Sequence, residues 1–345
     1  MTIRHWLLAL CLILGIVAPL RAQGPAKPLF ASVDPINLTL QGPLQTLIRD
    51  RTFTGSVSAT LTDPAGNRIP VSVRLRGITR RAADVCDFPP LRIDLTSPPP
   101  TNSVFAGQRR LKLVTHCKSS AGFQQKVLLE YAAYRMYSVL TERSMRARLA
   151  NITYNDESGR PIIARVGFFI EDEGDVAARN GLGTVHAGTR MPIAYLSPRD
   201  AGRFALYMHL LGNHDWSMRA GPPGDDCCHN ARLIGVAAPG QVIPIPYDFD
   251  FSGLVNAPYA TPPDALSISD VRQRLYRGYC SHNAEVLAAA RDMQARRGAM
   301  LGALNSVPGL DAKTRASADA YLGRFFADIA NDQTTTAKVL RTCIG

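Results

Sequence analysis

The 345-residue sequence contains no internal repeat of fixed period and no low-complexity stretch. The absence of a repeat excludes a solenoid or a propeller. Aromatic residues make up only 7% of the chain, and 27 glycines and 24 prolines are too few for a collagen-like protein. With 46% hydrophobic and 19% charged residues, the composition also differs from that of a disordered protein. The sequence therefore predicts a folded chain with one large domain or two lobes.

Two further patterns are missing, and each absence excludes a class of partner. The formal net charge is +11, but the lysines and arginines are scattered and form no stripe with interleaved aromatic residues. Nucleic acid is therefore not an expected partner. After residue 23, no stretch is long and apolar enough to suggest a transmembrane helix.

The first residues have the pattern of a secretory signal peptide. Arg4 and His5 form a short basic start, residues 6–17 form an apolar run, and Ala22 offers a cleavage site. We therefore expect residues 1–23 to be a signal peptide. The rest of the chain is expected to be exported, to the periplasm or outside the cell, without a transmembrane segment.

Six of the seven cysteines lie beyond this signal, which agrees with export to a compartment where disulfides form. Nearness in the sequence favours pairing Cys86 with Cys117 and Cys280 with Cys343. Spacing alone does not decide among the possible pairings, so these two bonds are predictions for the structure to test.

Cys227 and Cys228 are adjacent in the sequence. Because neighbouring cysteines rarely bridge each other comfortably, we expect each to pair elsewhere or both to stay reduced. A zinc site could draw on both thiolates together with His214 and His229. The chain has no Cys-x-x-Cys pair, however, and a structural zinc site is disfavoured.

Residue periodicity predicts strands in the first half of the chain and helices in the second. The expected strands lie at 54–62, 69–76, 90–96, 110–115, 148–155 and 162–170. The expected helices lie at 123–142, 197–211, 269–278, 283–304, 311–330 and 333–342. We therefore predict an α+β protein with a β-rich N-terminal lobe, residues 24–195, and a helix-rich C-terminal lobe, residues 196–345.

Two short polar segments carry most of the chemistry. The first follows the helix predicted at 197–211 and contains Asp215, with Asn230 further along the chain. The second is an apolar strand that ends in alternate carboxylates, Asp248 and Asp250. These side chains offer the hard oxygen ligands that Mg²⁺ or Mn²⁺ prefers. A phosphoryl-transfer site has three such parts. One Asp acts on the acceptor hydroxyl, an Asn binds metal, and an Asp at the end of a strand links the metal to the phosphates.

The order of segments resembles that of the spore coat CotH kinase-like family, a divergent branch of the protein-kinase-like fold. The resemblance covers about residues 70–255. It is carried by an Arg-Gly strand at 71–77 (VSVRLRG), a helix at 131–140, an Asp-Trp loop at 213–216 (NHDW) and an Asp-x-Asp strand at 246–250 (PYDFD). It implies a two-lobed protein-kinase-like fold. The implied activity is an exported phosphotransferase that uses ATP or another nucleotide and passes the phosphoryl group to an unknown protein or small-molecule acceptor.

By the same resemblance, Asp215 is the catalytic residue, while Asp248 and Asn230 bind the metal and Asp250 is a second ligand or a structural acid. The family's Arg-Gly strand places Arg76 in the cofactor-binding region. Further cofactor-binding candidates are Arg92, which stands where the family has Lys, and Lys112, which could meet Glu130 of the long helix.

Several of these residues have alternative roles that the sequence leaves open. Asp215 could cap a turn, and the acids of the Asp-x-Asp strand could pair with Arg74 or Arg76. Lys112 and Glu130 could form an ordinary surface ion pair. The sequence contains no Gly-rich phosphate loop, which favours a catalytically inactive kinase-like fold that serves as an envelope binding or scaffold protein. A metal-dependent hydrolase acting through these acids is a third possibility.

Overall fold

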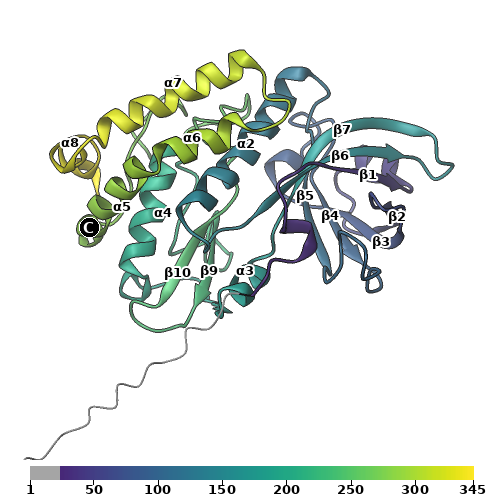
Figure 1. Ribbon diagram of the computed structural model, residues 1–345, viewed down its shortest axis with the longest axis horizontal. Helices are drawn as coiled ribbons and strands as arrows, with labels where there is room; N and C mark the ends of the chain where they lie inside the picture. Colours follow the sequence, from purple (N-terminus) through teal and green to yellow (C-terminus); the bar gives the residue numbers. More distant parts are fainter. Residues whose placement is uncertain (1–23) are drawn as a thin grey trace, which may run out of the picture.

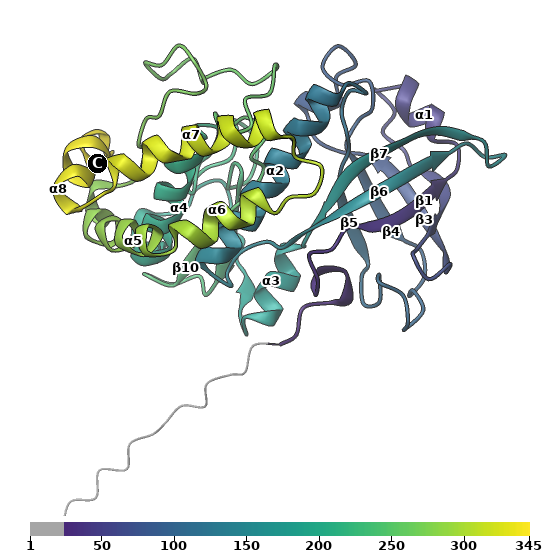
Figure 2. The same cartoon turned by 45° about the horizontal axis from the view of Figure 1, so that its top comes forward.

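The computed structural model describes residues 24–345, and the expected signal peptide, residues 1–23, lies outside this range. A β-barrel forms one end of the molecule and a helix-rich part the other, with helix α2 (Ala121–Leu140) between them (Figures 1 and 2). Each part has its own hydrophobic core. Within the described range, no helix combines the length and the apolar character that crossing a membrane requires.

The barrel closes because its first strand pairs on both sides. Strand β1 lies antiparallel to β2 and parallel to β6, with Ile36 opposite Ala150. The order around the barrel is β1-β2-β3-β4-β5-β7-β6. Its strands are β1 (Ile36–Gln41), β2 (Val57–Thr62), β3 (Arg68–Leu75), β4 (Leu91–Leu95), β5 (Arg110–Val114), β6 (Ala147–Asn155) and β7 (Pro161–Ile170). Alternate residues point inward, so that Leu38 and Val73 are both buried in the barrel core.

The expectation of a two-lobed protein-kinase-like fold is wrong, because the strands form a closed seven-stranded barrel with mixed pairing. Each strand predicted from residues 54 to 170 is present. A strand with one buried face has the same alternating pattern in an open sheet and in a barrel. Closure depends on the pairing of β1 with β6, which joins segments far apart in the sequence and leaves no local signal.

The helix-rich part packs around α2 and α4. Helix α2 lies against α6, whereas α4 contacts α5 and the strand β10. The other helices of this part are α3 (Glu173–Arg179), α4 (Pro198–Leu211), α5 (Asn283–Ala295), α6 (Arg297–Asn305), α7 (Ala312–Asp328) and α8 (Asp332–Lys338), whereas α1 (Leu44–Arg49) packs on the barrel core. A small antiparallel sheet has the order β10-β9-β8, with β8 (Gly183–Thr184), β9 (Ala231–Gly235) and β10 (Val242–Pro246).

The helix expected at 269–278 is not formed. Arg274 of this segment donates to the carbonyls of Leu210 and Tyr321, and Arg277 donates to the carbonyl of His214. These long-range contacts hold the segment in an irregular path and override its helical pattern. The helix expected at 283–304 is divided at Arg296 into α5 and α6.

Two of the three disulfides agree with the pairing predicted from the sequence. Cys86 is bonded to Cys117, and Cys280 is bonded to Cys343. The expectation for the adjacent pair is wrong, because Cys227 and Cys228 are bonded to each other. This bond leaves neither thiolate free to bind zinc together with His214 and His229.

The Cys280–Cys343 bond closes a separation of 63 residues and ties the end of the chain to the start of α5. In the chain-entropy model, removing such a bond costs up to about 4 kcal/mol of stability. We therefore predict that Cys280→Ser/Cys343→Ser lowers the free energy of unfolding, measured with denaturant under non-reducing conditions. Ser281→Ala, an exposed neighbour, is the matched control. Equal stability of the double variant and the wild type would show that the bond does not form in solution.

Candidate functional site

A polar cleft with a volume of about 520 Å³ gathers most of the predicted site residues. This volume lies in the range of about 300–1,000 Å³ that is typical of small-molecule sites. The cleft is lined by three arginines (Arg76, Arg80, Arg232), by five aspartates (Asp215, Asp225, Asp226, Asp248, Asp250) and by His229, Asn230 and Tyr247, among others. These residues come from the barrel end after β3, the loop after α4, and both ends of the β9–β10 hairpin.

The end of α4 places Asp215. The helix ends at Gly212, whose φ of 63° is left-handed and whose backbone N–H donates to the carbonyl of His209. A Cβ at Gly212 would lie 2.1 Å from Tyr321 Oη, so the close packing also requires glycine. The side chain of Asn213 then accepts a hydrogen bond from the backbone N–H of Asp215 and donates to the carbonyl of Asp248. Asn213 thereby links the two polar segments.

Asp215 is held by the two residues that precede β9. His229 Nε2 lies 2.7 Å from Asp215 Oδ1, and the Asn230 amide donates to Oδ2 at 3.0 Å. Paired backbone hydrogen bonds between Ser217 and His229 bring these segments together. The hydrogen bond with Asp215 raises the pKa of His229, although burial acts in the opposite direction. The imidazole is therefore a strong donor toward the Asp215 carboxylate.

The segment after β10 is anchored by an aromatic residue. Phe249 is fully buried, and its ring lies 4.6 Å from the ring of Tyr134 on α2 and 6.0 Å from that of Tyr207 on α4. The flanking carboxylates, Asp248 and Asp250, line the cleft. Asp248 has a left-handed backbone with a φ of 61°, and its N–H donates to Tyr134 Oη. The backbone of Asp248 is thus fixed while its side chain stays about one-third exposed.

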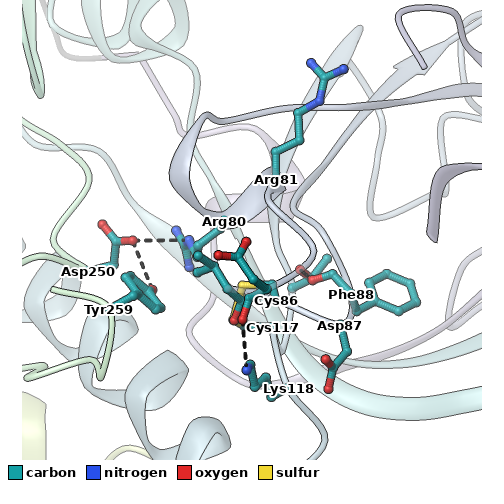
Figure 3. The surroundings of a disulfide bond; sticks show 12 residues. Arg80, Arg81, Cys86, Asp87, Phe88, Cys117, Lys118, Asp250 and Tyr259 are labelled. Carbon is teal, nitrogen blue, oxygen red and sulfur yellow. Dashed lines mark hydrogen bonds and ion pairs between the residues drawn. A yellow bond between two sulfur atoms is a disulfide. The ribbon is translucent and has the colours of Figure 1, made fainter. Parts of the chain in front are cut away.

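A buried arginine joins the cleft to α2. The guanidinium of Arg80 lies 3.1 Å from Glu130, 3.2 Å from Asp250 and 3.7 Å from Asp248. Figure 3 shows Arg80 pointing toward Asp250 and Tyr259, whereas Arg81 points away. The Cys86–Cys117 disulfide lies beside this segment and joins the loop after Arg80 to the end of β5.

Carboxylates outnumber the arginine in this buried cluster. Burial raises the pKa of Asp250 well above its usual range, and the charges of Asp248 and Glu130 reinforce this rise against the opposing effect of Arg80. Burial likewise raises the pKa of Glu130. For Arg80, burial lowers the pKa, but the charges of Glu130 and Asp250 outweigh this effect and raise it. The cluster therefore favours uptake of positive charge, as a proton or as a cation.

The structure brings together five of the eight predicted site residues in the lining of one cleft: Asp215, Asn230, Asp248, Asp250 and Arg76. Glu130 reaches the same cluster through Arg80. The expected contact between Lys112 and Glu130 is wrong, because Lys112 pairs with Asp172 and Glu173. Arg92 is paired with Asp94 on the barrel. Neither Arg92 nor Lys112 lines the cleft, although Lys112 Nζ lies 5.9 Å from the centre of the Tyr247 ring.

Two residues of the site, Arg80 and His229, have no clear signal in the sequence. Arg80 stands out only as part of a basic pair, and no local pattern distinguishes a buried arginine from its exposed counterparts. In the sequence, His229 is a candidate only for the disfavoured zinc site. The one signal that could have placed it in the cleft is its position directly before Asn230, a predicted ligand of Mg²⁺ or Mn²⁺. His214, the other histidine of that set, is buried, and desolvation together with Arg277 lowers its pKa to about 4. Its Nε2 accepts a hydrogen bond from the backbone N–H of Leu275, and His214 does not line the cleft.

The donor set of the cleft fits a magnesium-like ion bound together with a phosphorylated ligand. Within residues 24–345, no three or more His, Cys, Asp and Glu side chains form a group that could hold a metal ion by themselves. Mg²⁺ is usually held by only one or two carboxylates, waters and substrate phosphates. Asp248 and Asp250 supply two carboxylates, and the side chain of Asn230 adds an amide oxygen. The lining holds five aspartates and three arginines, so carboxyl groups outnumber guanidinium groups there.

Removing Arg80 should destabilise the protein strongly. Arg80→Met leaves Glu130 and Asp250 buried without their cation, and breaking a buried ion pair in this way costs about 3–5 kcal/mol. We expect the triple variant Arg80→Met/Glu130→Gln/Asp250→Asn to recover most of the lost free energy of unfolding, measured by urea denaturation. Arg81→Met is the matched control, since Arg81 donates only to the backbone carbonyls of Arg51 and Phe53. Equal losses of stability in Arg80→Met and Arg81→Met would show that the buried charge cluster does not stabilise the fold more than an ordinary arginine does.

No family model and no curated protein matches the chain. A search of solved structures finds the crystal structure of the Golgi casein kinase, at 10% sequence identity and a TM-score of 0.33. The match covers 93% of this chain and 76% of that one. The structural similarity to a kinase is therefore distant, and at this TM-score neither the fold nor the role of any residue can be transferred to this chain.

Proposed function

We propose that the cleft binds ATP or another nucleotide together with Mg²⁺ or Mn²⁺, and that the protein transfers a phosphoryl group to an acceptor hydroxyl. The observation that carries this proposal is the convergence of Asp215, Asn230 and Asp248 on one open cleft beside arginines. The excess of aspartates supports the requirement for a metal. Because a nucleotide adds negative charge to a cleft that is already acidic, it would be repelled unless a cation entered with it.

Asp248 is the principal metal-binding residue in this proposal, and Asn230 and Asp250 complete the set. A dication held there would neutralise and orient the phosphates. Asp248 suits this role because its backbone is fixed by Tyr134 and Asn213 while its carboxylate remains accessible. Asp250 is more restricted, since its Oδ2 already contacts Arg80 and Tyr259.

Arg76 and Arg232 are the groups best placed to contact phosphate oxygens. Both are organised by Tyr247, because Arg76 donates to its hydroxyl at 2.8 Å and Arg232 lies 4.5 Å from the centre of its ring. A guanidinium group matches phosphate oxygens through paired N–H donors. Arg80 contributes its charge to the cleft but is already engaged by three carboxylates.

Asp215 is proposed to act on the acceptor. The acceptor oxygen would form a new bond to the terminal phosphorus as the bond from phosphorus to the leaving nucleotide breaks, and Asp215 would take the hydroxyl proton. His229 and Asn230 hold the carboxylate in place for this step. The acceptor is a protein or a small molecule that reaches the cleft outside the cytoplasm, since the three disulfides fit an exported protein.

A second candidate function is that of a binding or scaffold protein without catalysis. One observation favours it: both carboxylate oxygens of Asp215 already accept hydrogen bonds from neighbouring side chains. Asp215 must weaken one of these bonds to receive a proton. Both candidate functions bind the same nucleotide and metal, and only the phosphotransferase converts the nucleotide to product.

We predict that Asp248→Asn abolishes metal-dependent nucleotide binding. Calorimetric titration of ATP in the presence of Mg²⁺ should show saturable binding to the wild type and none to this variant. The variant should remain folded without metal, because removing a carboxylate relieves repulsion with Asp250. Asp264→Asn, an exposed aspartate outside the cleft, serves as the control. Equal affinity of the wild type and Asp248→Asn would contradict the assignment.

Asp215→Asn should separate binding from transfer. The amide keeps the shape of the side chain but cannot take the hydroxyl proton, so we expect nucleotide affinity within about threefold of wild type and a loss of turnover of about 10²–10⁴-fold. Turnover is measured as release of nucleoside diphosphate in the presence of Mg²⁺. Where no other acceptor is supplied, water takes the phosphoryl group. A wild type that binds Mg²⁺ and ATP without turnover, on any acceptor supplied, would favour the scaffold function.

A further inference from the structure

A second charged cavity lies near the start of α4, away from the cleft that follows the end of this helix. It has a volume of about 530 Å³. Its charged lining consists of four arginines and two acids: Arg143, Arg199, Arg203, Arg296, Glu285 and Asp292. Because α4 has 14 residues, its length separates the two sites by about 20 Å.

Two arginines of the lining, Arg143 and Arg203, share one buried carboxylate that does not itself line the cavity. Arg143 Nη1 lies 3.0 Å from Asp200 Oδ2, and Arg203 Nη1 lies 3.2 Å from Asp200 Oδ1. Asp200 is buried and also accepts a hydrogen bond from the Ser197 hydroxyl at the start of α4. One carboxylate therefore pairs with two guanidinium groups, and the set of Arg143, Arg203 and Asp200 keeps a net charge of +1.

Arg203 is incompletely satisfied. Its side chain is only 10% exposed, and its Nε has no hydrogen-bond partner in the described part of the chain. A guanidinium carries five N–H donors, and a buried donor without a partner is costly. The Nε itself is closed off from solvent, and the hydrogen bond to Asp200 uses a donor of Nη1. Because Arg203 also lines the cavity, its remaining Nη donors are the ones available to an acceptor from outside the chain.

The remaining charges of the cavity do not balance this excess. Arg296 is paired with Asp292 at 2.8 Å and is fixed by a hydrogen bond to the carbonyl of Val139. Arg199 is exposed and Glu285 has the opposite charge, so these two contribute no net charge to the lining. The guanidinium groups come from the loop after α2, from α4 and from the junction of α5 and α6, which makes the arrangement a concave site rather than one exposed helix face.

We infer that this arginine cavity binds a small oxyanion, a phosphate or carboxylate group of a ligand that is distinct from the nucleotide of the cleft. Guanidinium groups recognise both anions through paired N–H donors. Arg143 and Arg203 are already oriented by Asp200, so little conformational freedom is lost on binding. Arg199 lies at the exposed edge of the cavity and completes the site when the anion is bound.

Calorimetric titration with inorganic phosphate, and separately with succinate, tests the inference. EDTA is included so that the metal-dependent cleft does not contribute. We expect saturable binding of at least one of the two probes to the wild type. Arg199→Gln should raise its Kd at least about tenfold, as expected for the loss of one charge-assisted hydrogen bond. Stronger binding of phosphate would assign a phosphorylated ligand, and stronger binding of succinate would assign a carboxylate.

Three further variants locate the site. Arg203→Lys keeps the charge but removes the guanidinium donors, and it should weaken binding to a similar degree. Arg291→Gln, which removes an exposed arginine paired with Asp332, should bind as the wild type does, and so should Arg76→Gln in the cleft. No saturable binding of either probe, or equal binding by the wild type and Arg199→Gln, would overturn the inference. Loss of binding in Arg76→Gln would place the anion in the cleft instead.

Discussion

The candidate site depends on one buried arginine. Arg80 connects the barrel to α2 through Glu130 and to the segment after β10 through Asp250 and Asp248. Moving a guanidinium group and its carboxylates out of water is costly, so such a cluster persists only where the geometry is good and the surrounding structure holds it. The Cys86–Cys117 disulfide on one side and the packing of Phe249 between two tyrosines on the other provide this support.

The same cluster supports the proposal that the cleft binds a cation. Three carboxylates share Arg80, and the charge of Arg76 acts on two of them, Glu130 and Asp248. Burial raises the pKa of both Glu130 and Asp250. A dication near Asp248 would supply positive charge and would at the same time allow a phosphorylated ligand to approach Arg76 and Arg232. Binding of metal and nucleotide is thus expected to be mutually dependent, because each reduces the electrostatic cost of the other.

Local features were predictable from the sequence, whereas long-range pairings were not. Period-two alternation located the strands that flank the site, and the helical pattern at 197–211 located α4, because these signals act over a few residues. Asp215 and Asp248 were identified because polar residues follow buried elements. Barrel closure by β1 and β6, the partner of Glu130 and the irregular path of 269–278 depend on contacts between distant segments. The sequence carried no local trace of these contacts.

The central claim is that Asp248 holds a divalent cation against the phosphates of a nucleotide in this cleft. The most direct test is a crystal structure with Mn²⁺ and a non-hydrolysable ATP analogue, in which anomalous scattering locates the metal. We expect one Mn²⁺ peak at coordination distance from the Asp248 carboxylate and from phosphate oxygens, with Arg76 or Arg232 contacting the same phosphates. A nucleotide bound elsewhere, or Mn²⁺ bound away from Asp248, would contradict this claim.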